Sequence, residues 1–250
     1  MALRRRQDSR QDSLEEAVMD ERTIGILGGM GPQATIELYQ RIVRDTGAKT
    51  DQDHLRTIID SNPKIPDRKI AVLAGGPDPT PALCETARNL ERAGVDFLTI
   101  PCNAAHIYVE AIRSSVGIPV LSIVEETVQS LLDRLPGART VGLMATGATV
   151  HSGLYAKPLE ERGIRTLVPD GEGQTDLDGA VYAVKAGRRD AQVQGQMVAV
   201  AKGLIASGAE ALLLACTEIP LVLGPHDVKV PVLDTLAILA QAAIREARRP

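Results

Sequence analysis

Aromatic side chains are scarce in this sequence of 250 residues, which has no Trp, one Phe and four Tyr. Proteins that bind single-stranded nucleic acid usually stack the bases on aromatic side chains, so the composition counts against that class. The net charge of −4 supports the same exclusion, because a phosphate backbone binds to a basic surface. We therefore expect no nucleic-acid partner and a core built from aliphatic side chains.

Long apolar runs and paired cysteines are also missing. No run approaches the ~20 apolar residues that cross a bilayer. The three cysteines are too few for a disulfide framework, and neither C-x-x-C nor H-x-x-x-H spacing occurs. We expect no membrane association, no metal site and a cytoplasmic location. Residues 1–22 contain an Arg cluster but no apolar segment of a secretory signal, and we expect them to be a mobile extension outside the fold.

Short apolar runs alternate with longer amphipathic stretches from residue 23 onward. Strands are predicted at residues 23–27, 55–59, 97–100, 120–123, 141–144, 166–168, 211–214 and 230–233. Helices are predicted at residues 34–45, 81–93, 105–114, 125–135 and 192–207. This alternation is typical of an α/β fold in which helices cover both faces of a parallel sheet. Gly94, Gly117, Gly163 and Gly208 stand where helices are expected to end.

The sequence also repeats itself. TIGILGGMGPQATIELYQRI resembles TVGLMATGATVHSGLYAKPL, and AGVDFLTIPCN resembles SGAEALLLACT. In the second pair the acidic residues Asp96 and Glu210 correspond, and so do Cys102 and Cys216. IPVLS and VPVLD form a third pair at nearly the same offset. The duplication predicts two similar lobes related by pseudo-twofold symmetry, each a mostly parallel sheet flanked by helices.

We expect the first lobe to comprise residues 23–119 plus 228–250, and the second to comprise residues 120–227. Open parallel sheets bind ligands beyond the carboxyl ends of their strands, and Cys102 and Cys216 each follow such an end. Two lobes that face each other would place these cysteines on opposite walls of a cleft. We expect the active site in that cleft.

A lone cysteine is usually a small buried side chain, and we expect that role for Cys84, which has no counterpart in the repeat. A thiol that acts as a base needs help, because its usual pKa of ~8.5 leaves little thiolate at neutral pH. Cys102 precedes a helical pattern whose N-terminus would favour a thiolate. His106, on the same helical face, is either an ionic partner of that thiol or an ordinary helix residue. Glu218 is the only ionisable candidate beside Cys216.

Five motifs in this order resemble the aspartate/glutamate racemase family, and most of all the cofactor-independent aspartate racemases: GGMGP, NPKIPDR, IPCNAAH, the K-A-G that begins at Lys185, and ACTEIP. The resemblance covers nearly all of residues 23–243. It implies a homodimer and an enzyme that needs neither pyridoxal phosphate nor metal. In such an enzyme, one thiolate removes the α-proton of an amino acid while a second thiol protonates the opposite face.

Carried onto this sequence, the resemblance makes Cys102 and Cys216 the acid/base pair. Arg68 and Lys185 would hold a dicarboxylic amino acid, although exposed cations of this kind are often only solvated surface charges. The residues implied to line the pocket are Met30, Gly31, Asn103, Ala104, Ala105 and Thr217, with His106 and Glu218 in support. Ala104 replaces the usual Thr of the family and Ala215 the usual Gly, which leaves the substrate less certain than the reaction.

A nicotinamide-dependent oxidoreductase is the strongest alternative from another class. Residues 29–34 fit G-x-G-x-x-A between a predicted strand and helix, and Asp60 ends the next strand, although later than the usual ~20 residues. That interpretation leaves the duplicated cysteines unexplained. Decarboxylases and cis–trans isomerases of the same superfamily, and a non-enzymatic amino-acid binder, are further alternatives. The paired cysteines favour racemisation over each of them.

Overall fold

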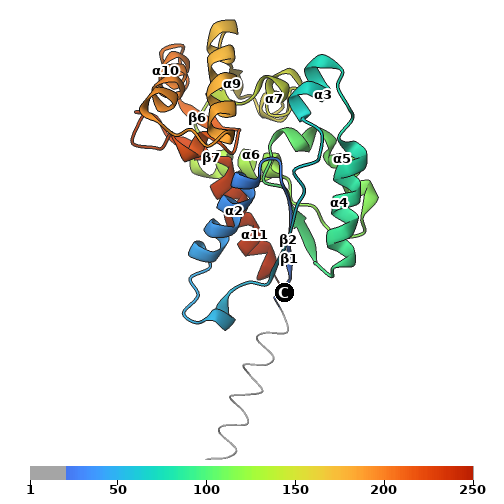
Figure 1. Ribbon diagram of the computed structural model, residues 1–250. Helices are drawn as coiled ribbons and strands as arrows, with labels where there is room; N and C mark the ends of the chain where they lie inside the picture. Colours follow the sequence, from blue (N-terminus) through green and yellow to red (C-terminus); the bar gives the residue numbers. More distant parts are fainter. Residues whose placement is uncertain (1–20, 250) are drawn as a thin grey trace, which may run out of the picture.

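The computed structural model describes residues 21–249, and the expected N-terminal extension lies outside this range except for its last two residues (Figure 1). Arg22 contradicts that expectation. Its backbone N–H donates to the carbonyl of Ala247 at 2.8 Å, and its guanidinium donates to the carbonyl of Asp96 at 3.1 Å and to the Glu246 carboxylate. The fold therefore begins before Thr23, because Arg22 ties the start of the first strand to the last helix.

The structure confirms an α/β protein with two parallel sheets flanked by helices. The first sheet has the order β2-β1-β3 and the second the order β5-β4-β6-β7, and every pair of neighbouring strands is parallel. The strands are β1 (Ile24–Gly28), β2 (Thr57–Ser61), β3 (Phe97–Thr99), β4 (Thr140–Met144), β5 (Arg165–Leu167), β6 (Ala211–Leu214) and β7 (Val232–Asp234).

The α-helices are α2 (Pro32–Asp45), α3 (Arg68–Ala74), α4 (Thr80–Arg92), α5 (Val109–Ser115), α6 (Ile123–Arg134), α7 (Gly147–His151), α8 (Ala156–Glu160), α9 (Gly171–Lys185), α10 (Ala191–Ala206) and α11 (Thr235–Ala247). Short 3₁₀ helices are η1 (Asp51–Asp53), η2 (Ala104–Tyr108) and η3 (Ile219–Leu221). No helix among the described residues is long and apolar enough to cross a membrane.

The acids of the repeat have the same structural role in both lobes. The Asp96 carboxylate accepts a hydrogen bond from the backbone N–H of Thr23 at 2.6 Å, and the Glu210 carboxylate accepts one from that of Thr140 at 2.8 Å. Each acid thus satisfies a free N–H at the start of a central strand, β1 or β4. The repeat in the sequence is therefore a repeat in three dimensions.

The last strand differs from the expected lobe boundaries. β7 pairs with β6, so the segment around Val232 belongs to the second sheet and not to the first. Its counterpart in the first lobe is Val120, which forms an isolated parallel bridge with Leu98 and replaces the strand expected at residues 120–123. The α-helix that follows each segment, α6 or α11, starts at once and ends the pairing. These two helices pack against each other, and α11 also packs against α2.

A central core of apolar side chains joins the two sheets. Successive residues of a strand point to opposite faces, so Ala211 and Leu213 of β6 enter this core while Leu212 and Leu214 pack with α9 and α10. The central core also takes side chains from β1, β4, α2, α6 and α11. On its outer face the first sheet packs against α4 and α5. The lobes therefore share one apolar layer, and their strand ends meet at a common edge.

Two local expectations were wrong. Gly117 does not end a helix, because α5 stops at Ser115 with Val116 as an extended C-cap; the other three glycines do follow helices with positive φ. The helix expected at residues 105–114 begins as the 3₁₀ helix η2 before it becomes α5. The helix α9 was not expected at all, because its sequence contains three Gly and no strong apolar periodicity.

Candidate active site

Both repeated cysteines line one small pocket at the carboxyl ends of the strands. Cys102 follows β3 and Cys216 follows β6, and both side chains are buried. The lining residues are Met30, Asp67, Arg68, Lys69, Cys102, Asn103, Ala104, Thr146, Thr149, Tyr182, Lys185, Ala215, Cys216, Thr217 and Glu218. The pocket has a volume of about 30 Å³, which holds one or two water molecules at most. An amino acid can therefore enter only after side chains at the mouth move.

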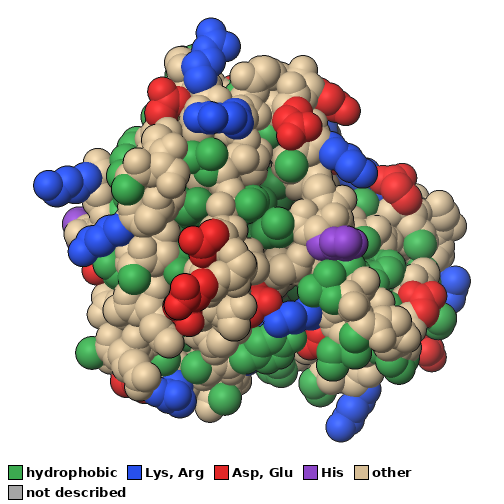
Figure 2. Space-filling view, turned by 90° about the horizontal axis from the view of Figure 1, so that it is seen from above, with side chains coloured by type: hydrophobic (Ala, Val, Ile, Leu, Met, Phe, Trp, Pro, Cys, Tyr) green, Lys and Arg blue, Asp and Glu red, His purple; other side chains and the backbone are tan. Residues whose placement is uncertain are grey.

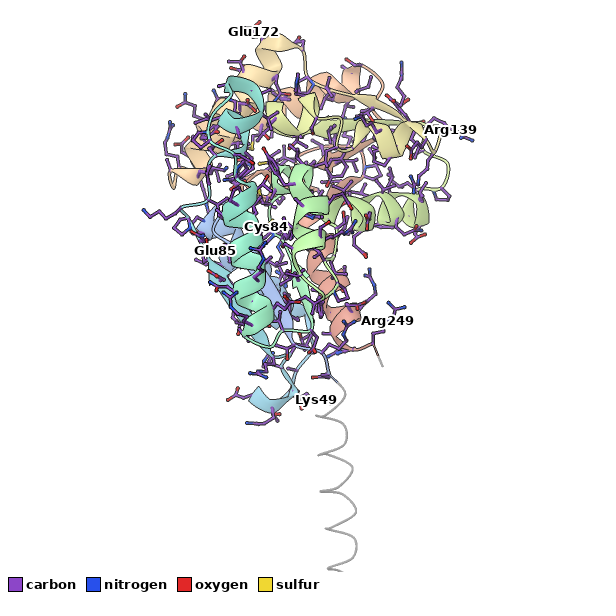
Figure 3. The ribbon with its side chains drawn as sticks, turned by 90° about the vertical axis from the view of Figure 1, so that its right-hand side faces the viewer. Lys49, Cys84, Glu85, Arg139, Glu172 and Arg249 are labelled. Atoms are coloured by element: carbon purple, nitrogen blue, oxygen red, sulfur yellow. The ribbon has the colours of Figure 1, made fainter. Side chains whose placement is uncertain are left out.

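A larger cavity lies elsewhere and contains neither thiol. It has a volume of about 1080 Å³ between α6, α11 and the loop before β7. The small pocket is the candidate site because it contains the duplicated thiols and several charged side chains. The third cysteine, Cys84, lies on α4 (Figure 3), is buried, and contacts the carbonyl of Ala111 through its Sγ at 3.5 Å. This placement agrees with the structural role expected for it.

The Cys102 side of the pocket is fixed by its neighbours. The side-chain carbonyl of Asn103 accepts a hydrogen bond from the Tyr155 hydroxyl at 2.5 Å, and its amide donates to the Thr235 hydroxyl at 3.2 Å. Cys102 therefore stands between a rigid strand end and a side-chain amide held from the other lobe. It also stands just before η2, where the sequence predicted a helix N-terminus.

His106 contacts the backbone of Cys102 rather than its sulfur. Nδ1 lies 2.9 Å from the Cys102 carbonyl, and Nε2 accepts a hydrogen bond from the N–H of Ile123 at 3.1 Å. Burial lowers the pKa of His106 to about 4, so the ring is neutral at neutral pH. Of the two roles left open by the sequence, the geometry supports that of a hydrogen-bonded structural residue, because both ring nitrogens already have backbone partners.

The Cys216 side carries a buried carboxylate. The Cys216 thiol donates to Oε2 of Glu218 at 3.1 Å, and the Thr217 hydroxyl lies 3.3 Å from the same oxygen. Burial, followed by the nearby Glu218 charge, raises the pKa of Cys216 well above its usual value, while Lys185 acts in the opposite direction. The other carboxylate oxygen, Oε1, has no hydrogen-bond partner among the described residues. A Cβ atom on Gly31 would lie 3.7 Å from it.

Arg68 is a buried cation held by backbone carbonyls. Its Nη1 donates to Pro66 at 2.8 Å and its Nη2 donates to Met30 at 3.0 Å. Its Nε has no partner among the described residues, so one edge of the guanidinium retains an unused donor. A solvated surface charge would have none of these features. Arg68 is thus fixed at the start of α3, and its Nε–H remains available to donate a hydrogen bond.

Lys185 ends helix α9 and brings a second positive charge to the pocket. Burial acts to lower the pKa of Lys185, but Glu218 and the two thiols outweigh it, and the pKa lies above its usual value. The ammonium is therefore charged at neutral pH. Its Nζ also lies over the ring of Tyr182, 5.4 Å from the centroid.

Contacts between α3 and α9 join two helices that contribute residues to the pocket, and sequence reasoning missed these contacts. Lys69 pairs with Asp178 at 2.6 Å, and the Tyr182 hydroxyl donates to the Asp67 carboxylate at 3.2 Å. The Lys69 ammonium lies 5.3 Å from the centre of the Tyr182 ring. One signal was present: Asp67 and Lys69 flank Arg68 within the NPKIPDR motif and its continuation. The partners of Asp67 and Lys69, namely Tyr182 and Asp178, lie on α9, a helix that the sequence did not predict.

Most of the expected site residues meet in the pocket. Met30, Arg68, Cys102, Asn103, Ala104, Lys185, Cys216, Thr217 and Glu218 line it. Gly31, Ala105 and His106 do not line it, although Gly31 lies beside Glu218. Ala105 and His106 are buried in η2 and support the loop of Cys102 from behind.

The glycine-rich loop after β1 is used for packing within the chain. Gly29 has a φ of +94°, and a Cβ on it would lie 2.4 Å from the backbone of Asn62. Its N–H donates to the Thr35 hydroxyl at 2.9 Å. The next residue, Met30, lines the thiol pocket and receives Arg68 on its carbonyl. The G-x-G-x-x-A pattern thus has a structural explanation that needs no dinucleotide.

The face seen from above in Figure 2 carries Lys, Arg, Asp and Glu side chains interspersed with one another. It shows no continuous basic area of the kind that binds a phosphate backbone. Among residues 21–249, no group of three or more His, Cys, Asp or Glu side chains is arranged to hold a metal ion.

A two-lobed α/β fold with paired thiols at its strand ends defines a class, the cofactor-independent amino-acid racemases, and comparison with known proteins leads to the same class. The family described as Asp/Glu/Hydantoin racemase matches residues 27–243. The chain belongs to this family and is therefore a racemase, an isomerase.

Individual relatives support this assignment. The broad specificity amino-acid racemase RacX of Bacillus subtilis is 30% identical over 227 residues, which are 88% of this chain and 96% of RacX. The structure of Picrophilus torridus aspartate racemase is 32% identical, with a TM-score of 0.82 over 90% of this chain and 94% of that one. An aspartate racemase homologue from Pyrococcus horikoshii is 28% identical, with a TM-score of 0.73 over 91% of this chain and 100% of that one.

Proposed function

We propose that this racemase interconverts the L and D forms of a dicarboxylic amino acid, aspartate before glutamate, with Cys102 and Cys216 as its two acid/base groups and without a cofactor. The observation that carries the proposal is the pair of thiols, which come from equivalent positions of the two lobes and line the same buried pocket.

Racemisation needs an acid and a base on opposite faces of the α-carbon. One cysteine, as thiolate, takes the α-proton, and the other, as thiol, gives a proton to the opposite face. The roles exchange when the other enantiomer is bound. The enzyme must therefore start each turnover with one cysteine ionised and the other protonated.

The two buried cations support a substrate with two carboxylates. The unpartnered Nε of Arg68 can donate to a carboxylate oxygen, and Lys185 adds a second positive charge to the same pocket. Positive groups fixed in a dry pocket also stabilise the negative charge that develops when the α-proton leaves. A neutral amino acid would leave one of these charges without a partner.

The name of RacX suggests the main alternative, a broad range of amino acids. Ala104 favours it in one respect, because this position lines the pocket and has no hydroxyl to bind a particular side chain. The buried Arg68 argues for the dicarboxylic substrate, because a buried cation costs free energy unless an anion accompanies it. Homodimer formation and a cytoplasmic location stay predictions.

Hydrogen exchange in D₂O tests the proposal. Purified protein, with no cofactor added, should incorporate deuterium at the α-carbon of L-aspartate while optical rotation is lost, as followed by NMR and polarimetry. A panel of neutral and acidic amino acids then ranks the substrates. Release of CO₂, or binding without exchange, would refute the proposal in favour of a decarboxylase or an amino-acid binder. Exchange that occurs faster with neutral amino acids than with aspartate would refute the dicarboxylic substrate alone.

A further inference from the structure

We propose that Glu218 and Cys216 act as one proton-sharing unit, in which the Glu218 carboxylate accepts the thiol proton whenever Cys216 has to serve as the base. The inference rests on the proposed function of the two thiols and assigns a role to a carboxylate that this function leaves unexplained. Glu218 acts through Cys216, so it is a positioning residue that also holds a proton.

The inference is based on a direct contact between the buried side chains of Cys216 and Glu218. The Cys216 sulfur lies 3.1 Å from Oε2 of Glu218, and both side chains are almost fully buried. The Thr217 hydroxyl lies 3.3 Å from the same oxygen and holds the carboxylate toward the thiol. No Arg or Lys forms a salt bridge with Glu218 among residues 21–249, although burial of a carboxylate normally requires one. The Cys216 thiol and the Thr217 hydroxyl donate to this carboxylate instead, and Lys185 acts on it through its charge without a salt bridge.

A buried thiol has a particular difficulty as a base. Loss of its proton to solvent would leave a thiolate beside a carboxylate, two anions in contact with little water to screen them. Transfer of the proton to Glu218 avoids this, because the pair carries one negative charge before and after the step. The field of Lys185 stabilises that charge on either atom. The carboxylate thus allows a thiol with a raised pKa to supply a thiolate at neutral pH.

Among residues 21–249, the Cys102 thiol has no such hydrogen bond to a carboxylate. In the repeat, Cys102-Asn103-Ala104 corresponds to Cys216-Thr217-Glu218, so Ala104 stands where the second lobe has the carboxylate. His106 cannot replace it, because both of its ring nitrogens are bonded to backbone groups. The two thiols therefore have different surroundings, although they occupy equivalent positions in the two lobes.

The proton balance closes in both directions. When Cys216 is the base, its proton moves to Oε2 of Glu218, the sulfur lone pair forms a new S–H bond to the α-hydrogen, and the C–H electron pair stays on the α-carbon. That carbon then takes the proton of the Cys102 thiol on its opposite face. At the end Cys102 is a thiolate, while Cys216 and Glu218 each hold a proton. In the reverse direction Cys102 abstracts, Cys216 donates, and protonated Glu218 hydrogen-bonds to the new thiolate.

A comparison of kcat/KM between the two directions of racemisation cannot test the role of Glu218. L and D enantiomers have equal free energies in water, so kcat/KM is the same in both directions for every variant. A spectroscopic measurement on Cys216 itself is therefore the more direct test. The infrared S–H band of Cys216 is obtained as the difference between the wild type and Cys216→Ser, and the same difference is taken with Glu218→Gln in both proteins.

In Glu218→Gln the S–H band should move to higher frequency, because an amide oxygen is a weaker acceptor than a carboxylate. Lys185, the other charged group that acts on Cys216, is unchanged in the comparison. An S–H band at the same frequency in both proteins would overturn the inference.

The matched kinetic test uses aspartate. Glu218→Gln should lower kcat about 10²–10⁴-fold at neutral pH with a nearly unchanged KM, the range expected for loss of a proton-transfer group. Glu218→Asp should recover part of the loss, and Glu126→Gln, which removes a carboxylate on remote α6, should match the wild type. A wild-type kcat in Glu218→Gln would overturn the inference. A rise in KM alone would also do so, because it would make Glu218 a ligand of the substrate ammonium.

Different results would refute the proposed racemase function and the proposed role of Glu218. If the wild type racemises no amino acid, the proposed function is wrong, while the infrared comparison still reports whether Cys216 and Glu218 share a proton. If Glu218→Gln does not fold, as judged by circular dichroism, Glu218→Asp serves in the infrared test. Its shorter side chain should weaken the contact and raise the S–H frequency, and an unchanged band would overturn the inference.

Discussion

The hydroxyl of Tyr155 donates a 2.5 Å hydrogen bond to the side-chain carbonyl of Asn103, and so joins the second lobe to the residue that follows Cys102. Both side chains are buried, and burial raises the pKa of Tyr155, so the hydroxyl keeps its proton and remains a donor. One thiol is thus positioned by a side chain from the opposite lobe, although its own strand belongs to the first sheet.

Removal of that hydroxyl should cost stability. Tyr155→Phe leaves a buried carbonyl oxygen without its donor, which should lower the free energy of unfolding by about 1–3 kcal/mol. The measurement is urea denaturation followed by circular dichroism. Tyr39→Phe is the control, because Tyr39 is exposed on α2. Equal stabilities of the two variants would show that the Tyr155 hydroxyl contributes nothing.

Both thiols of the pocket should be essential for racemisation. Cys102→Ser and Cys216→Ser should each reduce kcat for aspartate by more than about 10²-fold, because a hydroxyl is far too weak an acid to replace a thiol at neutral pH. Cys84→Ser should stay near the wild type, since Cys84 lies on α4 outside the pocket. Racemisation followed by polarimetry checks this. Substantial turnover by either pocket variant contradicts the two-thiol mechanism.

Arg68 should matter for substrates with two carboxylates. Loss of a hydrogen bond to a charged group costs about 1.5–3 kcal/mol, so Arg68→Ala should raise KM for aspartate by about 10–150-fold. The effect on a neutral amino acid such as alanine should be much smaller. Arg44→Ala, at an exposed position of α2, is the control for a lost surface charge. An unchanged KM for aspartate in Arg68→Ala would remove this residue from substrate binding.

His106 should make the fold sensitive to acid. Its pKa is about 4 in the folded protein, against ~6.5 in an unfolded chain, so the unfolded state binds the proton first as the pH falls. The stability contributed by neutral His106 is fully present above the unfolded value and is lost as the pH falls from about 6.5 to about 4, by up to about 3 kcal/mol.

Urea denaturation at pH 7 and at pH 5 measures this effect. The wild type should lose more stability between the two pH values than His106→Asn, whose amide does not titrate. The variant will be less stable at pH 7, because it loses backbone hydrogen bonds at both ends of the ring. An equal loss in both proteins would mean that other groups control the acid sensitivity.

Local apolar patterns and the internal repeat were enough to predict most central strands and the equivalent positions of the two lobes. Apolar runs predicted β1, β3, β4 and β6 well, because buried parallel strands are nearly continuous in apolar residues. Asp96 and Glu210 marked equivalent positions, and the structure shows why: each accepts a hydrogen bond from a backbone N–H at or just before the start of a central strand. Local signals of this kind survive in the sequence because short-range contacts produce them.

Contacts between distant segments were the part that could not be predicted. Nothing local in the segment around Val232 says whether it pairs with β3 or with β6, because the same motif occurs in both lobes. The ion pair of Lys69 and Asp178 joins helices more than a hundred residues apart. The role of His106 was also undecided, since one helical spacing fits both a thiol partner and a backbone partner.

The hydrogen bond from the N–H of Arg22 to the carbonyl of Ala247 brings the two ends of the described chain together. A linker of a few residues could therefore close residues 21–249 into a ring without disturbing either sheet. The exposed turn at Gly137, between α6 and β4, is then a suitable place for new ends. A circular permutant opened there would have the order of its two lobes reversed, with every contact of the thiol pocket retained.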